Sequence, residues 1–500
     1  MCIIKVDGGF PLLKSADKRS GGMVYSSYEF IFIFLPVVLA GYFLLQNLKS
    51  PKFQRVFLII ASLFFYGYNN VKYVPLIVLS VLINYLVARA IRHFETKEKH
   101  KLSKTFLALG IVVNVLILGY YKYYNFFMEN VSFVFNLEYS FKNIFLPLGI
   151  SFFTFQQMSF LISIYKKEHK LGNFIDYFAF VTFFPQLVAG PIVLYDEIEP
   201  QFMDESRRRF NLQNFSKGLF MFALGMFKKV VVADTLAVFV DNGFGMTNMS
   251  LALSWATALS YTVQIYFDFS GYSDMAIGLG KMFNIDITYN FLSPYKSKNV
   301  SEFWRKWHIT LGRALSTYIY RPLGGNRKGI ARTCINLFLT FFVSGIWHGA
   351  AWTFVVWGVL YGIIVVFERL FKNTLERIPN VLRIALTFLC VNALWVLFRA
   401  ENFADAIEIY RGMVNFSNIG IKAIADIATD GIINFPAVVG VAYVLGLLFV
   451  SLFVVFKCKN SAYLYEKFSF TKMECAMTVI FFVVSVLFMS RGSVFIYFNF

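Results

Sequence analysis

Long apolar runs recur along this chain of 500 residues and are separated by short polar loops. A helix that crosses a bilayer needs about 20 mainly apolar residues, within a range of roughly 17–25. Several runs are short, so the pattern predicts about eleven membrane-spanning helices together with re-entrant and interfacial helices. The runs lie at about 28–45, 56–69, 73–91, 106–121, 143–165, 212–240, 251–270, 333–346, 350–367, 381–398, 437–456 and 476–489.

The composition of the chain agrees with this interpretation. Hydrophobic residues make up 58% of the chain and charged residues only 15%, whereas about a quarter of the residues in a soluble domain are charged. We therefore predict an all-α polytopic integral membrane protein, and a soluble enzyme is excluded. No internal repeat and no low-complexity linker divides the sequence, so residues 23–500 are predicted to form one membrane domain.

The chain has a formal net charge of +18. In a soluble protein this charge would suggest a nucleic-acid partner, but here Lys and Arg fall in short loops between apolar runs, which usually face the cytoplasm. We expect no nucleic-acid partner, basic loops in the cytoplasm and an N-terminus outside it. The loops used for this orientation hold Lys49, Lys52 and Arg55; Arg89, Arg92, Lys97, Lys99, Lys101 and Lys104; Lys166, Lys167 and Lys170; and Arg207, Arg208 and Arg209.

Residues 1–22 are polar and differ from the segment that follows. They lack the short apolar core and small-residue cleavage site of a signal peptide. Met23 then opens the apolar sequence MVYSSYEFIFIFLP. We interpret residues 1–22 as a disordered N-terminal extension and Met23 as a candidate start.

Residues 174–193 form an apolar stretch that is interrupted by Pro185, Gly190 and Pro191. Proline removes a backbone donor and bends or ends a helix. At membrane depth, irregular backbone persists only where protein or a water-filled cavity covers it. Two interpretations remain open: a re-entrant hairpin that lines an internal cavity, and an ordinary span with a kink.

Residues 299–318 are predicted to form one amphipathic helix at the cytoplasmic interface. Asn299 and Glu302 resemble a capping box, and Glu302 and Lys306 form a favourable i,i+4 pair. One face carries Val300, Trp304, Trp307, Leu311, Ala314 and Tyr318, and the other carries mainly Glu302, Arg305, Lys306 and Arg313. His308 borders the apolar face, either as a functional group or as a cap that bonds a backbone carbonyl.

His348 lies between two apolar runs and has Gly345 and Gly349 close by. Small neighbours would let a substrate or another backbone approach the imidazole. Removal from water favours the neutral ring, which can accept a proton. His348 is thus a candidate general base for acyl transfer, and the alternative is a buried histidine that links two helices.

Other charged residues have two interpretations each. Asp268 and Asp274 flank FSGYS in an apolar region, where they could orient an imidazole, bind a cation or pair with Lys and Arg across the bundle. The loop RPLGGNRKG carries Arg321, Arg327 and Lys328, which could hold the phosphates of a cytosolic donor or simply reflect topology.

Several familiar site types are not predicted. The sequence contains no GxxxxGK[ST], GxSxG or HExxH motif, which disfavours a P-loop, a serine-hydrolase elbow and a zinc protease. The five cysteines show no ligand spacing, so neither a disulfide framework nor a metal site is expected. They are Cys2, Cys334, Cys390, Cys458 and Cys475.

Several segments together resemble the membrane-bound O-acyltransferases, known as MBOAT proteins, and within them the alginate O-acetyltransferase branch of bacterial polysaccharide acetylation. The resemblance covers nearly the whole chain from Met23. The segments are YFDFSGYSDMAIGLG, EFWRKWHITLG, PLGGNRKG and SGIWHGAAWTFVVWG, together with MVYSSYEFIFIFLP, FPQLVAGPI, FRAENFADAI and the C-terminal FIYFNF.

This resemblance implies a bundle of tilted helices around a central tunnel in the bacterial cytoplasmic membrane, surrounded by membrane lipid. It implies His348 as the essential histidine and His308 as the second. It also implies acetyl-CoA or another acyl thioester as donor, no bound cofactor, a polysaccharide acceptor outside the cytoplasm and an SGNH-type acetyltransferase partner. Further candidates for the donor site or tunnel are Trp304, Arg305, Trp307, Asp268, Asp274, Trp347, Arg321, Arg327 and Lys328.

Three alternatives stay open. The chain could transfer D-alanine to teichoic acid, as another branch of the family does. It could also be a transporter without chemistry, although no paired halves interrupted by Pro and Gly are visible. Finally, it could be a non-catalytic subunit of a polysaccharide-export complex. The residues do not identify the polysaccharide.

Overall fold

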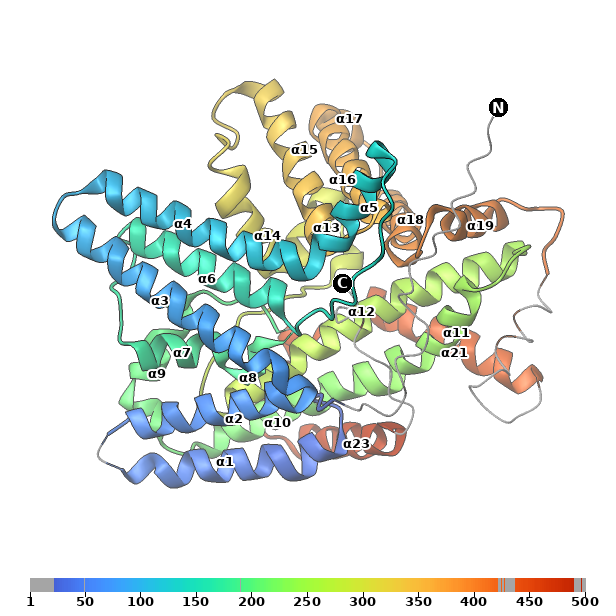
Figure 1. Cartoon of the computed structure of the whole chain (residues 1–500). Helices are drawn as coiled ribbons and strands as arrows, with labels where there is room; N and C mark the ends of the chain where they lie inside the picture. Colours follow the sequence, from blue (N-terminus) through green and yellow to red (C-terminus); the bar gives the residue numbers. More distant parts are fainter. Residues whose placement is uncertain are drawn as a thin grey trace.

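The computed structural model describes residues 22–48, 50–188, 190–420 and 437–489, together with Ile424, Ile427 and Ile496. Within these residues helices dominate, and strand pairing is limited to one isolated antiparallel bridge between Phe291 and Trp307. The predicted all-α class is confirmed (Figure 1). The predicted N-terminal extension lies outside the described residues except for Gly22.

The first half of the chain forms η1 Phe30–Phe34, α1 Leu35–Leu44, η2 Leu45–Asn47, α2 Lys52–Asn70, η3 Val71–Tyr73, α3 Val74–Thr96, α4 His100–Leu118, η4 Gly119–Tyr123, α5 Tyr124–Phe135, α6 Ile150–Tyr165, α7 Phe174–Thr182, α8 Phe184–Leu187, α9 Tyr195–Met203, η5 Glu205–Arg208, α10 Leu212–Met226, η6 Phe227–Ala233 and α11 Asp234–Phe244. The second half forms α12 Leu251–Met282, η7 Pro294–Lys296, α13 Val300–Lys306, α14 Ile309–Leu315, η8 Ser316–Tyr320, α15 Gly329–His348, α16 Trp352–Leu370, α17 Lys372–Leu375, α18 Asn380–Arg399, α19 Phe403–Met413, α21 Ala437–Lys457, α22 Ser461–Lys467 and α23 Lys472–Phe488.

Seven described helical stretches are long and apolar enough to cross a membrane, fewer than the eleven or so spans expected from the apolar runs. The runs 143–165, 212–240, 251–270 and 476–489 are not among them. The first corresponds to α6, which has only 16 residues, and the third lies in α12, whose side chains include two aspartates. The seven stretches are Phe30–Asn47, Lys52–Thr96, which holds both α2 and α3, His100–Phe135, Gly329–His348, Trp352–Leu370, Asn380–Arg399 and Gly440–Lys457.

Helix α12 is the centre of the bundle (Figure 1). It has 32 residues, nearly all of them buried, and it packs against α10, α11, α18, α19 and α21. Because protein rather than lipid covers this helix, its residues need not be apolar, and it can carry Asp268 and Asp274. Apolar length alone therefore does not identify a helix of this kind.

The interrupted stretch 174–193 forms two short helices, α7 with 9 residues and α8 with 4, and the chain breaks between them at Phe183. Neither helix approaches the length of a span, so the interpretation as an ordinary kinked span is wrong. Pro185 occupies the first turn of α8, where its missing N–H costs no hydrogen bond. The described residues of this stretch are almost all buried in the bundle.

Helices α15 and α16 form a hairpin whose backbones touch at two glycines. A Cβ atom added at Gly358 would lie 2.6 Å from the carbonyl oxygen of Phe341 and 2.9 Å from the Cα atom of Gly345. Side chains at this crossing would force the helices apart, so glycine sets the distance between them. The expectation that small residues near His348 admit another backbone is confirmed for Gly345.

Replacing Gly358 with alanine should lower the thermal midpoint of the purified protein, because the added methyl group overpacks the crossing at a cost of about 1–3 kcal/mol. Gly446→Ala is the matched control, since nothing lies within 4 Å of a Cβ at that helical position, and alanine there should be neutral or slightly stabilising. Equal midpoints for the two variants would contradict the close approach of α15 and α16.

Candidate active site

His348 is the last residue of α15 and is enclosed by aromatic rings. The chain leaves the helix through Gly349, which is extended, and α16 begins at Trp352. The imidazole is 2% exposed. Its ring centroid lies 5.1 Å from those of Trp347 and Trp357 and 5.3 Å from that of Phe398. The end of a helix, the hairpin turn and an aromatic wall thus fix where the imidazole lies.

His308 does not lie on a continuous helix, so the prediction of one helix over 299–318 is wrong. Helix α13 ends at Lys306, α14 begins at Ile309, and His308 between them has a left-handed backbone with φ 46°. The side chain is fully buried rather than at the edge of an interfacial face. It packs edge-on against Phe269 of α12, with ring centroids 4.7 Å apart.

The break at His308 is imposed by the segment around Asn290. The N–H of Ile309 donates to the carbonyl oxygen of Asn290, and the N–H of Leu292 donates to that of Lys306, at 3.1 and 3.0 Å. These two hydrogen bonds hold the backbone on both sides of His308, in place of the hydrogen bonds of a continuous helix. The periodicity of the sequence continues through the break and therefore gives no sign of it.

The Asn290 side chain also fixes the tautomer of His308. Its Oδ1 atom accepts from the backbone N–H of Thr310 at 3.2 Å and from the Thr310 hydroxyl at 3.0 Å, so this atom is the amide oxygen. It lies 3.2 Å from Nδ1 of His308. Because an amide oxygen only accepts, Nδ1 of the neutral ring carries the hydrogen, and Nε2 is the nitrogen that can accept a proton.

Trp347 joins the two histidines. Its ring centroid lies 5.1 Å from that of His348 and 6.1 Å from that of His308. Two histidines that are 40 positions apart in the chain therefore share one aromatic neighbour in the core of the bundle.

Trp304 and Trp307 support this region from α13 and its C-terminal end. Trp307 is fully buried and packs against Trp395 with ring centroids 4.9 Å apart. Trp304 is half-buried and packs against Tyr361 at 5.1 Å and Trp357 at 5.6 Å. Trp304 thus contacts Trp357, one of the rings that enclose His348, whereas Trp307 packs on Trp395 behind it. Their role in a donor site or tunnel stays a prediction.

The sequence of the chain was compared with those of known proteins. The sequence model of the membrane-bound O-acyltransferase family, MBOAT, matches residues 70–399, which include both histidines. The peptidoglycan O-acetyltransferase of Helicobacter pylori is 39% identical, over 96% of this chain and 98% of that protein.

This chain belongs to the membrane-bound O-acyltransferases.

Two further relatives extend the comparison. A probable alginate O-acetylase of Pseudomonas putida is 40% identical over 79% of this chain and 81% of that protein. The teichoic acid D-alanyltransferase of Bacillus subtilis is 23% identical over 51% of this chain and 69% of that protein. The predicted family is confirmed, and the chain is an O-acyltransferase.

In this O-acyltransferase the candidates Asp268 and Asp274 pair with lysines of η6. Lys229 lies 2.9 Å from Asp268, and Lys228 lies 2.6 Å from Asp274. Lys229 also contacts Asp234. The sequence left three roles open for these aspartates: orienting an imidazole, binding a cation, or pairing with Lys and Arg. The structure shows that both aspartates pair with lysines across the bundle.

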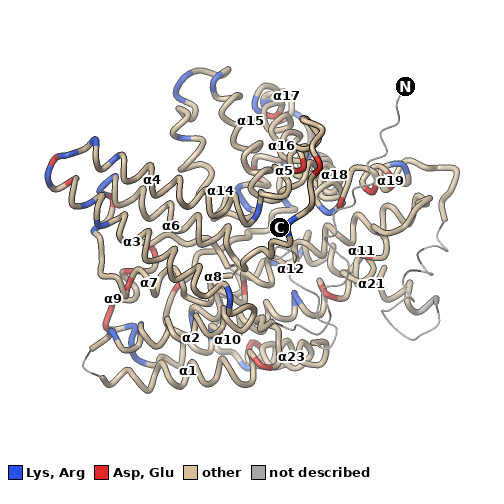
Figure 2. Tube along the Cα trace, viewed as in Figure 1, with Lys and Arg blue, Asp and Glu red and all other residues tan. Residues whose placement is uncertain are grey.

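The basic candidates lie on the surface. Arg305 on α13 is exposed, and so are Arg321, Arg327 and Lys328 in the loop between η8 and α15. Figure 2 shows basic residues gathered on this loop and on the loop between α3 and α4. These side chains are exposed whereas both imidazoles are buried, so we do not assign them to proton transfer.

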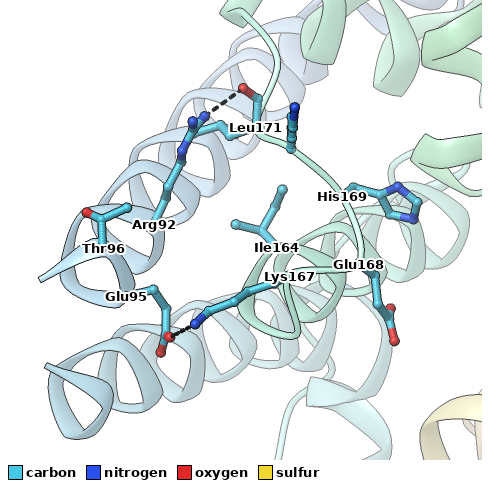
Figure 3. Close-up of a pocket in the computed structure, with 9 residues that line it drawn as sticks. Arg92, Glu95, Thr96, Ile164, Lys167, Glu168, His169 and Leu171 are labelled. Atoms are coloured by element: carbon cyan, nitrogen blue, oxygen red, sulfur yellow. Dashed lines mark hydrogen bonds and ion pairs between the residues drawn. The ribbon is translucent and has the colours of Figure 1, made fainter. Parts of the chain in front are cut away.

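A charged cavity of about 470 Å³ lies where α3 ends and the loop after α6 begins. Figure 3 shows partners in the protein for two of its basic side chains, Arg92 and Lys167. Lys167 lies 3.2 Å from Glu95, and Arg92 donates to the carbonyl oxygen of Leu171 at 3.1 Å. Neither site histidine lines this cavity, and we do not assign it to the chemical step.

The sequence analysis missed Lys122 and Tyr123, which contact the end of α15 from η4. Lys122 donates to the carbonyl oxygens of Trp347 and His348, and Tyr123 donates to that of Ile346. A signal was present, because Lys122 directly follows the apolar run 106–121, and a charge in such a place is unusual.

The burial of His308 should make stability depend on pH. This residue lies outside the seven candidate spans, and burial lowers its pKa from 6.5 to about 3. Below about pH 6.5 the unfolded chain binds a proton that the folded chain does not, so stability is present above that pH and is lost as the pH falls. We expect the thermal midpoint to fall between pH 7.5 and pH 5, and to fall less in His308→Asn, because asparagine does not titrate in this range. Asn is chosen because it tolerates the left-handed backbone. Identical pH dependence in both proteins would contradict this burial.

Proposed function

We propose that this protein transfers an acetyl group from a cytosolic acyl thioester to hydroxyl groups of a glycan outside the cytoplasm, and that peptidoglycan is the first acceptor to test. The observation that carries the proposal is the pair of buried imidazoles on Trp347, in a chain that aligns over nearly its whole length with a peptidoglycan O-acetyltransferase. A secreted polysaccharide is the second candidate acceptor, because the relatives named as alginate O-acetylases are equally similar over four-fifths of the chain.

His348 is proposed as the general base. Its imidazole takes the proton of the acceptor hydroxyl while that oxygen attacks the thioester carbonyl carbon. A C–O bond forms and the C–S bond breaks. The proton then passes from the imidazole to the leaving thiolate, so the free thiol and an acetyl ester are the products and the histidine returns to its neutral form.

His308 is proposed as a second polar contact in the same space. Its Nδ1–H points to Asn290, which leaves Nε2 able to accept a hydrogen bond from the acceptor hydroxyl or from a water molecule. This role orients the nucleophile and is less demanding than proton abstraction. We therefore expect a smaller loss of rate when His308 is removed than when His348 is removed.

Transfer also requires the site to open. In this structure His348 is enclosed by Trp347, Trp357 and Phe398. The proposed tunnel therefore forms when aromatic side chains move as the donor or acceptor enters.

Under this proposal the basic loops face the cytoplasm of a bacterium and the N-terminus faces outward.

Donor and acceptor reach the site from opposite sides. The exposed loop with Arg321, Arg327 and Lys328 is proposed to hold the phosphates of acetyl-CoA or of a related thioester. An SGNH-type acetyltransferase outside the membrane is the proposed partner, which either receives the acetyl group or passes it to the glycan. Such a relay moves the acetyl group across the membrane while CoA stays in the cytosol.

Replacing His348 with alanine should abolish acetylation of the glycan, because no other group is proposed to accept the hydroxyl proton. His308→Ala should lower the initial rate by about 10²-fold, the size of loss that a nucleophile misplaced by about 1 Å can cause. Acetate released by mild base from purified peptidoglycan and from secreted polysaccharide measures both effects in cells that lack the native gene.

His93→Ala is the matched control for these variants, because His93 is exposed on α3, away from the site. It should acetylate normally, and all three variants should reach the membrane in equal amounts. Full acetylation by His348→Ala would refute the general-base role. If acetate is found on the secreted polysaccharide but not on peptidoglycan, the secreted polysaccharide becomes the proposed acceptor in place of peptidoglycan.

Neutralising the exposed loop should weaken donor binding without changing the chemical step. In Arg321→Ala/Arg327→Ala we expect a higher KM for acetyl-CoA, an unchanged kcat and a weaker dependence of KM on salt, because phosphate contacts are screened by ions. Steady-state assays with purified protein measure these quantities. A KM equal to that of the parent would place the donor elsewhere.

A further inference from the structure

Lys122 lies in a π-helical turn that interrupts a long membrane helix. Helix α4 runs from His100 to Leu118, η4 from Gly119 to Tyr123 and α5 from Tyr124 to Phe135, and together they make one of the candidate spans. Such turns are rare and occur frequently at functional sites. The turn brings two consecutive side chains, Lys122 and Tyr123, against the end of α15.

The Lys122 ammonium lies among three acceptors. Its Nζ atom is 2.5 Å from the carbonyl oxygen of Trp347, 3.2 Å from that of His348 and 3.5 Å from Oγ of Ser151. It also lies over the indole of Trp347, 5.6 Å from the ring centroid. In the part of the chain that the structure describes, none of the ion pairs includes Lys122, so its contacts are with carbonyl oxygens, a hydroxyl and an aromatic ring.

Tyr123 completes the contact with the helix end. Its hydroxyl donates to the carbonyl oxygen of Ile346 at 2.8 Å. The last four carbonyl groups of an α-helix have no partner within the helix, and in α15 three of them are bonded by these two side chains. A cation is also favourable at this end, where the helix dipole is negative.

We propose that Lys122 and Tyr123 are positioning residues that hold the last turn of α15, and with it the imidazole of His348, in the geometry for acyl transfer. This inference rests on the proposed role of His348 as general base. Both contacts are to the backbone of residues 346–348 and not to the imidazole, so the effect on His348 passes through the main chain.

The geometry distinguishes this role from direct stabilisation of the reacting carbonyl. An ammonium group has three hydrogens, and the three acceptors around Lys122 are all protein atoms. Two of its hydrogens are directed to the carbonyl oxygens of Trp347 and His348, and Ser151 Oγ lies 3.5 Å away as the third acceptor. Lys122 therefore acts on the chemistry through the helix end.

The test is steady-state acetyl transfer by purified full-length protein with acetyl-CoA as the probe. In Lys122→Met the two carbonyl bonds and the charge are lost, and we expect kcat to fall by about 10²-fold, since a misplacement of about 1 Å can cost that much. The KM for acetyl-CoA should stay unchanged. The thermal midpoint should fall somewhat, because two buried carbonyls lose their donor, but the amount of folded protein should fall far less than kcat. Lys122→Arg keeps the charge and the donors and should restore most of kcat.

Tyr123→Phe removes one hydroxyl and one bond, so it should give a smaller loss of kcat in the same direction. Lys142→Met is the matched control, because Lys142 is an exposed lysine whose ammonium lies over the ring of Tyr124. It should behave as the parent protein. If Lys122→Met does not reach the membrane, Tyr123→Phe and Lys122→Arg are judged by the same kcat, KM and midpoint.

Two results would overturn the inference. One is an unchanged kcat in Lys122→Met, or in Tyr123→Phe if only that variant folds. The other is a loss of kcat that Lys122→Arg does not restore or that comes with an equal loss of folded protein. His348→Ala separates this inference from the proposed function. Activity in His348→Ala refutes the base itself, whereas an inactive His348→Ala beside a fully active Lys122→Met refutes only the positioning.

Discussion

A polar group inside this bundle has to find its partner within the protein, because the surrounding hydrocarbon offers none. The structure meets this constraint with a few buried pairs between elements that are far apart in the sequence. Arg55 of α2 lies 2.5 Å from Asp176 of α7. Lys228 and Lys229 of η6 pair with Asp274 and Asp268 of α12. Each pair fixes one helix against another, and removing the cation of any pair would leave a buried carboxylate without its partner.

The same constraint shapes the candidate active site. Three of the free carbonyls at the end of α15 accept hydrogen bonds from Lys122 and Tyr123. The turn that carries His308 is held by Asn290, which also sets the tautomer of the ring. In both places a polar contact from a distant segment determines where an imidazole lies. The functional proposal thus depends on the backbone contacts of the two histidines as much as on the histidines themselves.

Much of the fold class and the family could be predicted from the sequence, because long apolar runs and sparse charge leave few alternatives to a polytopic membrane protein. His348 became a candidate in the same way, since a histidine between two apolar runs is costly unless it has a use, and the structure places it in the buried core at the end of α15. The break at His308 could not be found, because the residues that cause it are around Asn290 and contact it only in the folded chain. Fewer described stretches than expected qualify as spans by length and apolar content, because α12 is covered by protein and carries two aspartates, and apolar runs do not distinguish a lipid-facing helix from a buried one. The pairing of Asp268 and Asp274 needed the structure for the same reason.

The central claim is that the reacting acyl carbon meets His348 at the end of α15 once the aromatic wall has opened. A structure of the full-length protein with a non-transferable acetyl-CoA analogue tests this claim most directly. The account predicts the acetyl carbonyl beside the imidazole of His348, with Trp347, Trp357 or Phe398 displaced and the α15 end still bonded to Lys122. An analogue whose acetyl group lies away from both imidazoles, with the aromatic wall unchanged, would contradict it.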